Sequence, residues 1–255
     1  WLVPISQRLF RINPELRRRI RMFDYKVMSQ TESNLMRVMP FINSVKKLDG
    51  IERIRLELAL MNGDSKMVDI IFERNKGLKR KYMPVRTVLD EIYDKAEKAG
   101  FDMGFIDEYF PRMISDHEGF IKFMYGTYNK GTLDKEIYAK EKEIGRKLTM
   151  EERGELLSSR IRGFGSKIHE GKPGSTKKRK VPFITSEMNA YYHSVEHSLT
   201  HYISNMINAI ETRDFFQATE ITEETIGDWV STLLEKGKIK PEQQEELVNI
   251  LKIRF

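Results

Sequence analysis

The sequence predicts an all-α fold, an irregular multi-helix assembly with one long helix in its C-terminal half and a flexible basic linker. Three observations support this prediction. Apolar residues recur at helical spacing along most of the 255 residues. Prolines and glycines divide the chain into blocks of helical length. No series of alternating apolar and polar residues indicates a sheet, so short apolar runs such as residues 67–72 are assigned to helices.

Helix-start and helix-stop residues define most of the expected elements. Asn13 caps a helix with Pro14 at its first position, and Pro40 is expected to kink or split that helix. Asp49 and Asp64 cap the next two. Thr149 and Glu152 form a capping box. The expected helices cover residues 14–48, 49–60, 64–75, 85–96, 116–124, 133–147, 149–162, 186–216, 223–236 and 241–253.

Two connecting segments have distinct compositions. Gly77 and Pro84 are expected to bracket a basic loop, Lys79-Arg80-Lys81. Residues 101–115 are dense in apolar side chains, which favours an ordered connector with Tyr109 and Phe110 packed on the helices.

The clearest linker extends from Gly163 to Lys180, with four glycines, a proline and a basic run. Such a segment cannot bury enough apolar surface to offset its ordering entropy, so we expect it to be mobile. It divides the chain into an N-terminal helical domain (residues 1–162), a basic glycine-rich linker (163–181) and a C-terminal helical region (182–255).

Composition excludes several classes of protein. The chain has no cysteine, which excludes disulfides, thiolate chemistry and sulfur-ligated metals. No apolar run approaches the ~18 residues that a bilayer-spanning helix needs, and no signal-peptide pattern is present, so we expect a soluble protein. Because the first residue is Trp1 rather than Met, we also expect the sequence to start inside a longer product or after processing.

Two basic stretches are the main candidate binding sites. Residues 1–47 contain ten Lys/Arg against three Asp/Glu, and residues 160–181 contain eight against one, so each carries a formal charge of +7. Such density suits phosphate neutralisation without base readout. The alternative is that the first stretch is simply a solvent-exposed helix face and the second a flexible loop, and that neither binds a partner. The candidate nucleic-acid-binding residues are Arg17, Arg18, Arg19, Arg21, Lys177, Lys178, Arg179 and Lys180.

Three histidines lie within nine residues, at positions 193, 197 and 201. With Glu196, the first two form an H-x-x-E-H pattern, the inverted zinc-peptidase motif. The third ligand would have to be His201, about two helical turns or ~11 Å from His193 along the axis, which is too far for one ion to bind both. We therefore expect no metal site and no cofactor, and no pair of carboxylates is nominated for acid–base catalysis.

Several segments resemble large polyvalent proteins of phages and mobile elements. The matching stretches are Ile5-Ser6-Gln7-Arg8-Leu9 with residues 16–24, then Leu58 to Asp64, Gly104 to Arg112, and the helical tail from Lys180 to Phe216. At the histidines the sequence departs from the family pattern. Relatives in this family include internal virion proteins ejected with the genome, virion-packaged polymerases and conjugative-element proteins.

This resemblance implies a non-enzymatic helical module of a virion or ejected protein, located in the virion or in the cytoplasm of the bacterial host. Its expected partners are nucleic acid, bound non-specifically through phosphates, and other virion proteins or other domains of its parent. One alternative is a scaffold segment of a large multidomain enzyme, either a virion-packaged polymerase or a peptidase. A second alternative is a plain protein-interaction module.

Overall fold

The computed structural model describes residues 5–102, 109–117, 119–120, 123, 130–149, 152 and 183–255. Within these ranges it contains helices and no strand, with one isolated antiparallel bridge between Ile114 and Tyr192. The all-α prediction is therefore confirmed. The helices are α1 (Ile5–Ile12), α2 (Pro14–Val45), α3 (Gly50–Asn62), α4 (Ser65–Arg74), α5 (Leu78–Lys98), α7 (Lys130–Ile144), η2 (Met188–Tyr191), α9 (Val195–Phe216), α10 (Glu223–Glu235), η3 (Pro241–Gln243) and α11 (Gln244–Arg254).

The predicted caps begin the first helices of the bundle. The Asn13 side chain accepts the backbone N–H groups of Glu15 and Leu16, at 2.8 and 3.0 Å, and Pro14 occupies the first position of α2. Asp49 and Asp64 likewise accept backbone N–H groups at the starts of α3 and α4. Between those two helices Gly63 adopts φ 69°, a left-handed conformation that glycine tolerates without a side-chain clash.

Pro40 is expected from the sequence to kink or split its helix, and the split does not occur, because α2 continues through Pro40. The Ser44 hydroxyl donates to the Pro40 carbonyl oxygen at 2.8 Å. The neighbouring residues Val38, Phe41 and Ile42 are fully buried. Burial of these side chains offsets the backbone hydrogen bond that proline cannot donate.

The predicted basic loop between Gly77 and Pro84 is wrong. Gly77 is the N-cap of α5, in a left-handed conformation, and the helix passes through Pro84. Lys79, Arg80 and Lys81 therefore lie in its first turns. Tyr82 and Val85 on this stretch are buried, so tertiary packing outweighs the local signal that proline and glycine provide.

The long C-terminal helix begins at Val195, not near Ser186 as predicted. Residues 192–194 are extended instead. The His193 N–H donates to the Met113 carbonyl at 2.8 Å, and the Ser115 N–H donates to the Tyr191 carbonyl at 2.7 Å. The 3-10 helix η2 and the pairing of residues 191–193 with the 113–115 segment thus take the place of the first turns of the expected helix. Ser194 then caps α9 by accepting the His197 N–H.

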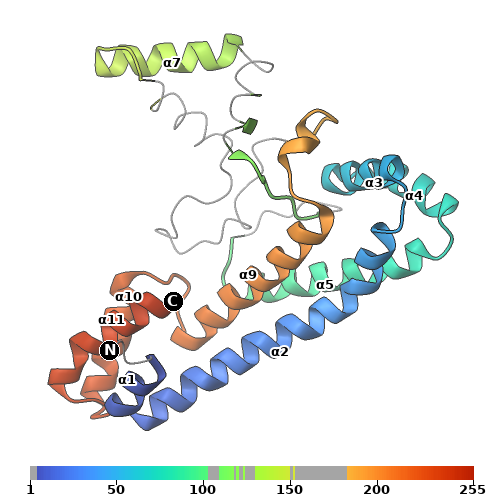
Figure 1. The fold of residues 1–255 in the computed structure, drawn as a ribbon. Helices are drawn as coiled ribbons and strands as arrows, with labels where there is room; N and C mark the ends of the chain where they lie inside the picture. Colours follow the sequence, from blue (N-terminus) through green and yellow to red (C-terminus); the bar gives the residue numbers. More distant parts are fainter. Residues whose placement is uncertain are drawn as a thin grey trace.

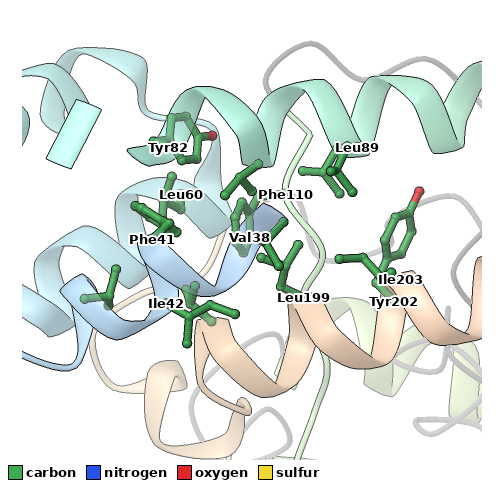
Figure 2. Packing of buried hydrophobic residues seen from close by; sticks show 14 of the residues in the cluster. Val38, Phe41, Ile42, Leu60, Tyr82, Leu89, Phe110, Leu199, Tyr202 and Ile203 are labelled. Carbon is green, nitrogen blue, oxygen red and sulfur yellow. The ribbon is translucent and has the colours of Figure 1, made fainter. Parts of the chain in front are cut away.

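Helix α9 packs against both α2 and α5, and these three form the centre of the molecule (Figure 1). The main hydrophobic core lies among them, and α3 and α4 close one end. Figure 2 shows how the side chains meet, with Val38, Phe41 and Ile42 from α2, Leu60 from α3, Tyr82 and Leu89 from α5, Leu199, Tyr202 and Ile203 from α9, and Phe110 from the connector.

The connector prediction is confirmed for residues 109–115. Phe110 is completely buried in the main core, and the Tyr109 ring lies 5.6 Å from that of Tyr202. A further apolar cluster gathers Met61, Phe120, Ile184 and Met188 with neighbouring residues.

The opposite end of α2 has its own core. There α1, α10 and α11 surround the start of α2 and the end of α9 (Figure 1). Its buried residues include Leu9, Leu16, Ile20, Phe216, Ile226, Val230, Leu247, Ile250 and Leu251. Helices from both sides of the proposed linker therefore share cores. The linker itself lies outside the described residues, and the division at residues 163 and 181 stays a prediction.

Candidate nucleic-acid interface

The arginines of α2 lie on a helix that buries only one face. Leu16, Ile20 and Phe23 recur at helical spacing. Leu16 and Ile20 belong to the core formed with α1, α10 and α11, and the buried Phe23 ring packs against Phe215 and Phe255. Four arginines fall within five residues of the same turns, so they cannot share that face. Arg18, Arg19 and Arg21 are exposed, and Arg17 is half-buried.

The exposed arginines differ in what they contact. Arg18 and Arg21 have no hydrogen-bond or ion-pair partner among the described residues. The Arg19 guanidinium lies 5.5 Å from the centroid of the Phe215 ring and 5.4 Å from that of Trp229, in cation–π contact with both. The aromatic rings thus hold Arg19 in place, whereas Arg18 and Arg21 keep their donors free for an anion.

Nearby charges are already paired. Arg8 forms an ion pair with Glu246 at 3.0 Å, and Glu15 lies 3.6 Å from Lys238. Asp24 binds Arg254. These acidic side chains are therefore occupied by other cations, and they leave the positive charge of Arg18 and Arg21 uncompensated among the described residues.

A groove of about 530 Å³ lies beside these arginines, between α2 and α9. Arg18 and Arg19 lie at one end. Met22 and Tyr25 line it as well, and both are largely exposed, at 60% and 62%. The residues lining the groove are Arg18, Arg19, Met22, Phe23, Tyr25, Lys26, Ser29, Gln30, Glu211, Asp214 and Phe215.

Lys26 balances the acidic residues at the other end of the groove. Its Nζ lies 2.6 Å from Glu211 and 3.1 Å from Asp214. The hydrogen bond to Glu211 raises the pKa of Lys26, despite the opposing effect of burial. Gln30 also donates to Glu211, at 2.7 Å. The groove therefore has a cationic end and an end where charges largely compensate each other.

Sequence reasoning identified the arginines but not the groove beside them. Met22, Tyr25 and Lys26 lie off the apolar face of α2, and this exposure was readable from the helical spacing. Glu211 and Asp214 come from α9, about 190 residues away, and no local pattern relates them to α2. The second predicted basic run, Lys177, Lys178, Arg179 and Lys180, lies outside the described residues, so its four positions remain predictions.

The histidines form a row at the start of α9. The His193 and His197 rings stack at 4.0 Å between centroids, and the His197 and His201 rings at 5.9 Å. Burial and the neighbouring histidines, including His117, lower the pKa of His193. Glu196 forms an ion pair with Lys46, the C-cap residue of α2, at 2.8 Å.

The described residues contain neither a metal-binding cluster nor a membrane-spanning helix. No three His, Cys, Asp or Glu side chains there are grouped in a way that could hold a metal ion. None of the helices in the described ranges is long and apolar enough to cross a bilayer. Compared with models of protein families, with curated proteins and with solved structures, the chain matches none.

Proposed function

We propose that this chain is a non-enzymatic helical module of a large phage-type protein, carried in the virion or ejected into the host cytoplasm, that binds nucleic acid through its phosphates. The observation that carries the proposal is the pair Arg18 and Arg21. Both guanidinium groups are exposed on the first turns of α2 and lack a partner among the described residues. The sequence resemblance to large polyvalent proteins supplies the phage context.

Physical chemistry favours phosphate over a carboxylate-bearing protein as the ligand of these arginines. A guanidinium presents a planar fork of donors that matches phosphate oxygens. The binding of several phosphates also releases condensed counterions from the polyanion, a gain that an isolated acidic side chain does not offer. The excess positive charge of residues 1–47 attracts the polyanion before contact.

Fluorescence anisotropy with labelled duplex DNA at low salt tests the proposal. We expect weak binding without sequence preference, with a log–log salt slope near −0.9 for each phosphate neutralised. The double variant Arg18→Gln/Arg21→Gln should bind several-fold more weakly, with a shallower slope. No binding below ~100 μM, the weak end of ordinary non-specific affinity, would refute the proposal.

The matched control is Arg55→Gln/Arg74→Gln. Both residues are exposed and lie on α3 and α4, at the opposite end of α2 from the interface (Figure 1). This variant changes the net charge by the same amount. If it weakens binding as much as the Arg18/Arg21 variant does, the affinity depends on overall charge and the proposed interface is wrong.

A further inference from the structure

We infer that the groove between α2 and α9 binds single-stranded nucleic acid, with a phosphate on Arg18 and a base stacked on the Tyr25 ring. The inference rests on the proposed function and specifies its ligand. It depends on three features of the groove, which are a free aromatic ring, its position relative to the arginines, and the distribution of charge.

Tyr25 has an aromatic ring with no internal role. It is 62% exposed and makes no hydrogen bond or ring contact with any described residue. By contrast, Phe23, two residues earlier, is buried and packs edge-on against Phe215 and Phe255. Exposing a large aromatic side chain to water costs hydrophobic free energy. A planar ligand that covers the Tyr25 ring in the groove would recover part of that cost.

The spacing along α2 places the ring near the arginines. Arg18, Met22 and Tyr25 follow one another at positions i, i+4 and i+7, which form one stripe of a helix. At 1.5 Å per residue, Tyr25 lies about 10 Å along the axis from Arg18. Met22, also exposed, fills the interval with a flexible apolar side chain.

Charge orients a nucleotide within the groove. Arg18 and Arg19 form the cationic end, whereas Glu211 and Asp214 at the other end would repel a phosphate. Lys26 binds both carboxylates, so that end accepts a neutral group better than a charged one. A phosphate at the arginine end and an uncharged base over Tyr25 match this division.

Single-stranded and double-stranded nucleic acids differ in whether the faces of their bases are available for stacking on Tyr25. Proteins that bind single strands combine a positive groove with aromatic rings on which bases stack, because unpaired bases offer their faces. In a duplex those faces are covered by neighbouring base pairs. Tyr25 therefore contributes to binding a single strand and adds nothing for a duplex.

The test compares a labelled single-stranded oligonucleotide with a duplex of equal length, using the full chain. We expect Tyr25→Leu to weaken single-strand binding on the order of tenfold, the usual effect of losing one stacked base. The salt slope should stay unchanged, because no phosphate contact is lost. Tyr25→Phe should retain wild-type affinity, and duplex binding should be unaffected by either change.

Tyr138→Leu is the matched control, since Tyr138 is 69% exposed on α7 and does not line the groove. Wild-type single-strand affinity in Tyr25→Leu would overturn the inference. An equal loss for the duplex would also overturn it, because stacking cannot explain that loss. If Arg18→Gln/Arg21→Gln still weakens binding in either case, the proposed phosphate contact survives and only the stacking is wrong.

Discussion

Glu57 is a carboxyl group in the core, only 9% exposed, at the junction of α3 with α9. Burial raises its pKa above the ordinary 4.5, although the charge of Arg53 and a hydrogen bond from the Val195 backbone oppose the shift. The proton is thus held more strongly in the folded state than in the unfolded one. The contribution of Glu57 to stability is therefore full below pH 4.5 and declines as the pH rises through its folded pKa.

Replacement of Glu57 by Gln should raise the melting temperature at pH 7, because the amide removes a buried charge and keeps an oxygen for the Val195 N–H. The gain should vanish as the pH falls below 4.5, where the native carboxyl is already neutral. Thermal melts followed by circular dichroism at pH 7, 5 and 4 measure this. Glu73→Gln, on the exposed surface of α4, is the control. A lower melting temperature at pH 7 would mean that the charged hydrogen bond outweighs burial.

Arg213 shows that a cation can have a structural role in this molecule. It is buried, its guanidinium lies 3.3 Å from the centroid of the Phe101 ring, and it donates to the Ala99 carbonyl at 3.0 Å. Burial lowers its pKa. Because Ala99 ends α5, this arginine ties the last turn of α9 to the end of α5. A positively charged residue of this chain is therefore not a binding residue merely because of its charge.

At the scale of elements, local chemistry predicted the helices that begin at a cap. Asn13, Asp49 and Asp64 each start a helix where their side chains accept backbone donors. Local chemistry wrongly predicted a loop before Pro84 and a helix start near residue 186, because contacts with distant segments determine the structure at both places. The candidate site shows the same difference. The exposure of its arginines could be predicted from helical spacing, but the groove could not, because residues of the distant helix α9 form one of its sides.

Replacement of Asn13 by Ala should destabilise the protein by more than the typical N-cap cost of about 1 kcal/mol. The additional hydrogen bond from its amide to the Lys238 carbonyl, at 2.5 Å, places the loss in the upper part of the ~0.5–2 kcal/mol range. Urea unfolding measures it. Asn249→Ala, at an exposed position inside α11, should cost nothing because alanine favours a helix interior. Equal stability of Asn13→Ala and wild type would show that α2 does not need this cap.

At the scale of the whole molecule, the main core depends on a side chain from a connector. Phe110 is fully buried among residues of α2, α5 and α9. Sequence reasoning identified its burial from the density of aromatic residues. It did not indicate which helices would surround the ring, because their packing is set by contacts across most of the chain.

Replacement of Phe110 by Ala should cost about 3–5 kcal/mol, since it removes a large buried side chain and leaves a cavity. Phe183→Ala changes the same atoms at a position that is 60% exposed, and its effect should be small. Chemical denaturation of both variants gives the comparison. A loss below about 1 kcal/mol for Phe110→Ala would mean that the surrounding helices collapse into the vacated space.

The second core, around the start of α2, joins segments that lie more than 200 residues apart in the chain and are therefore synthesised at different times. Arg8 binds Glu246, and Leu16 and Ile20 share a cluster with Leu247 and Ile250. Until α10 and α11 have been synthesised, this part of α2 lacks the cover that these two helices give to its apolar face. Closing a chain loop of more than 200 residues is entropically costly and slow. During synthesis, the start of α2 therefore exposes its basic face and part of its apolar stripe until α10 and α11 dock onto it.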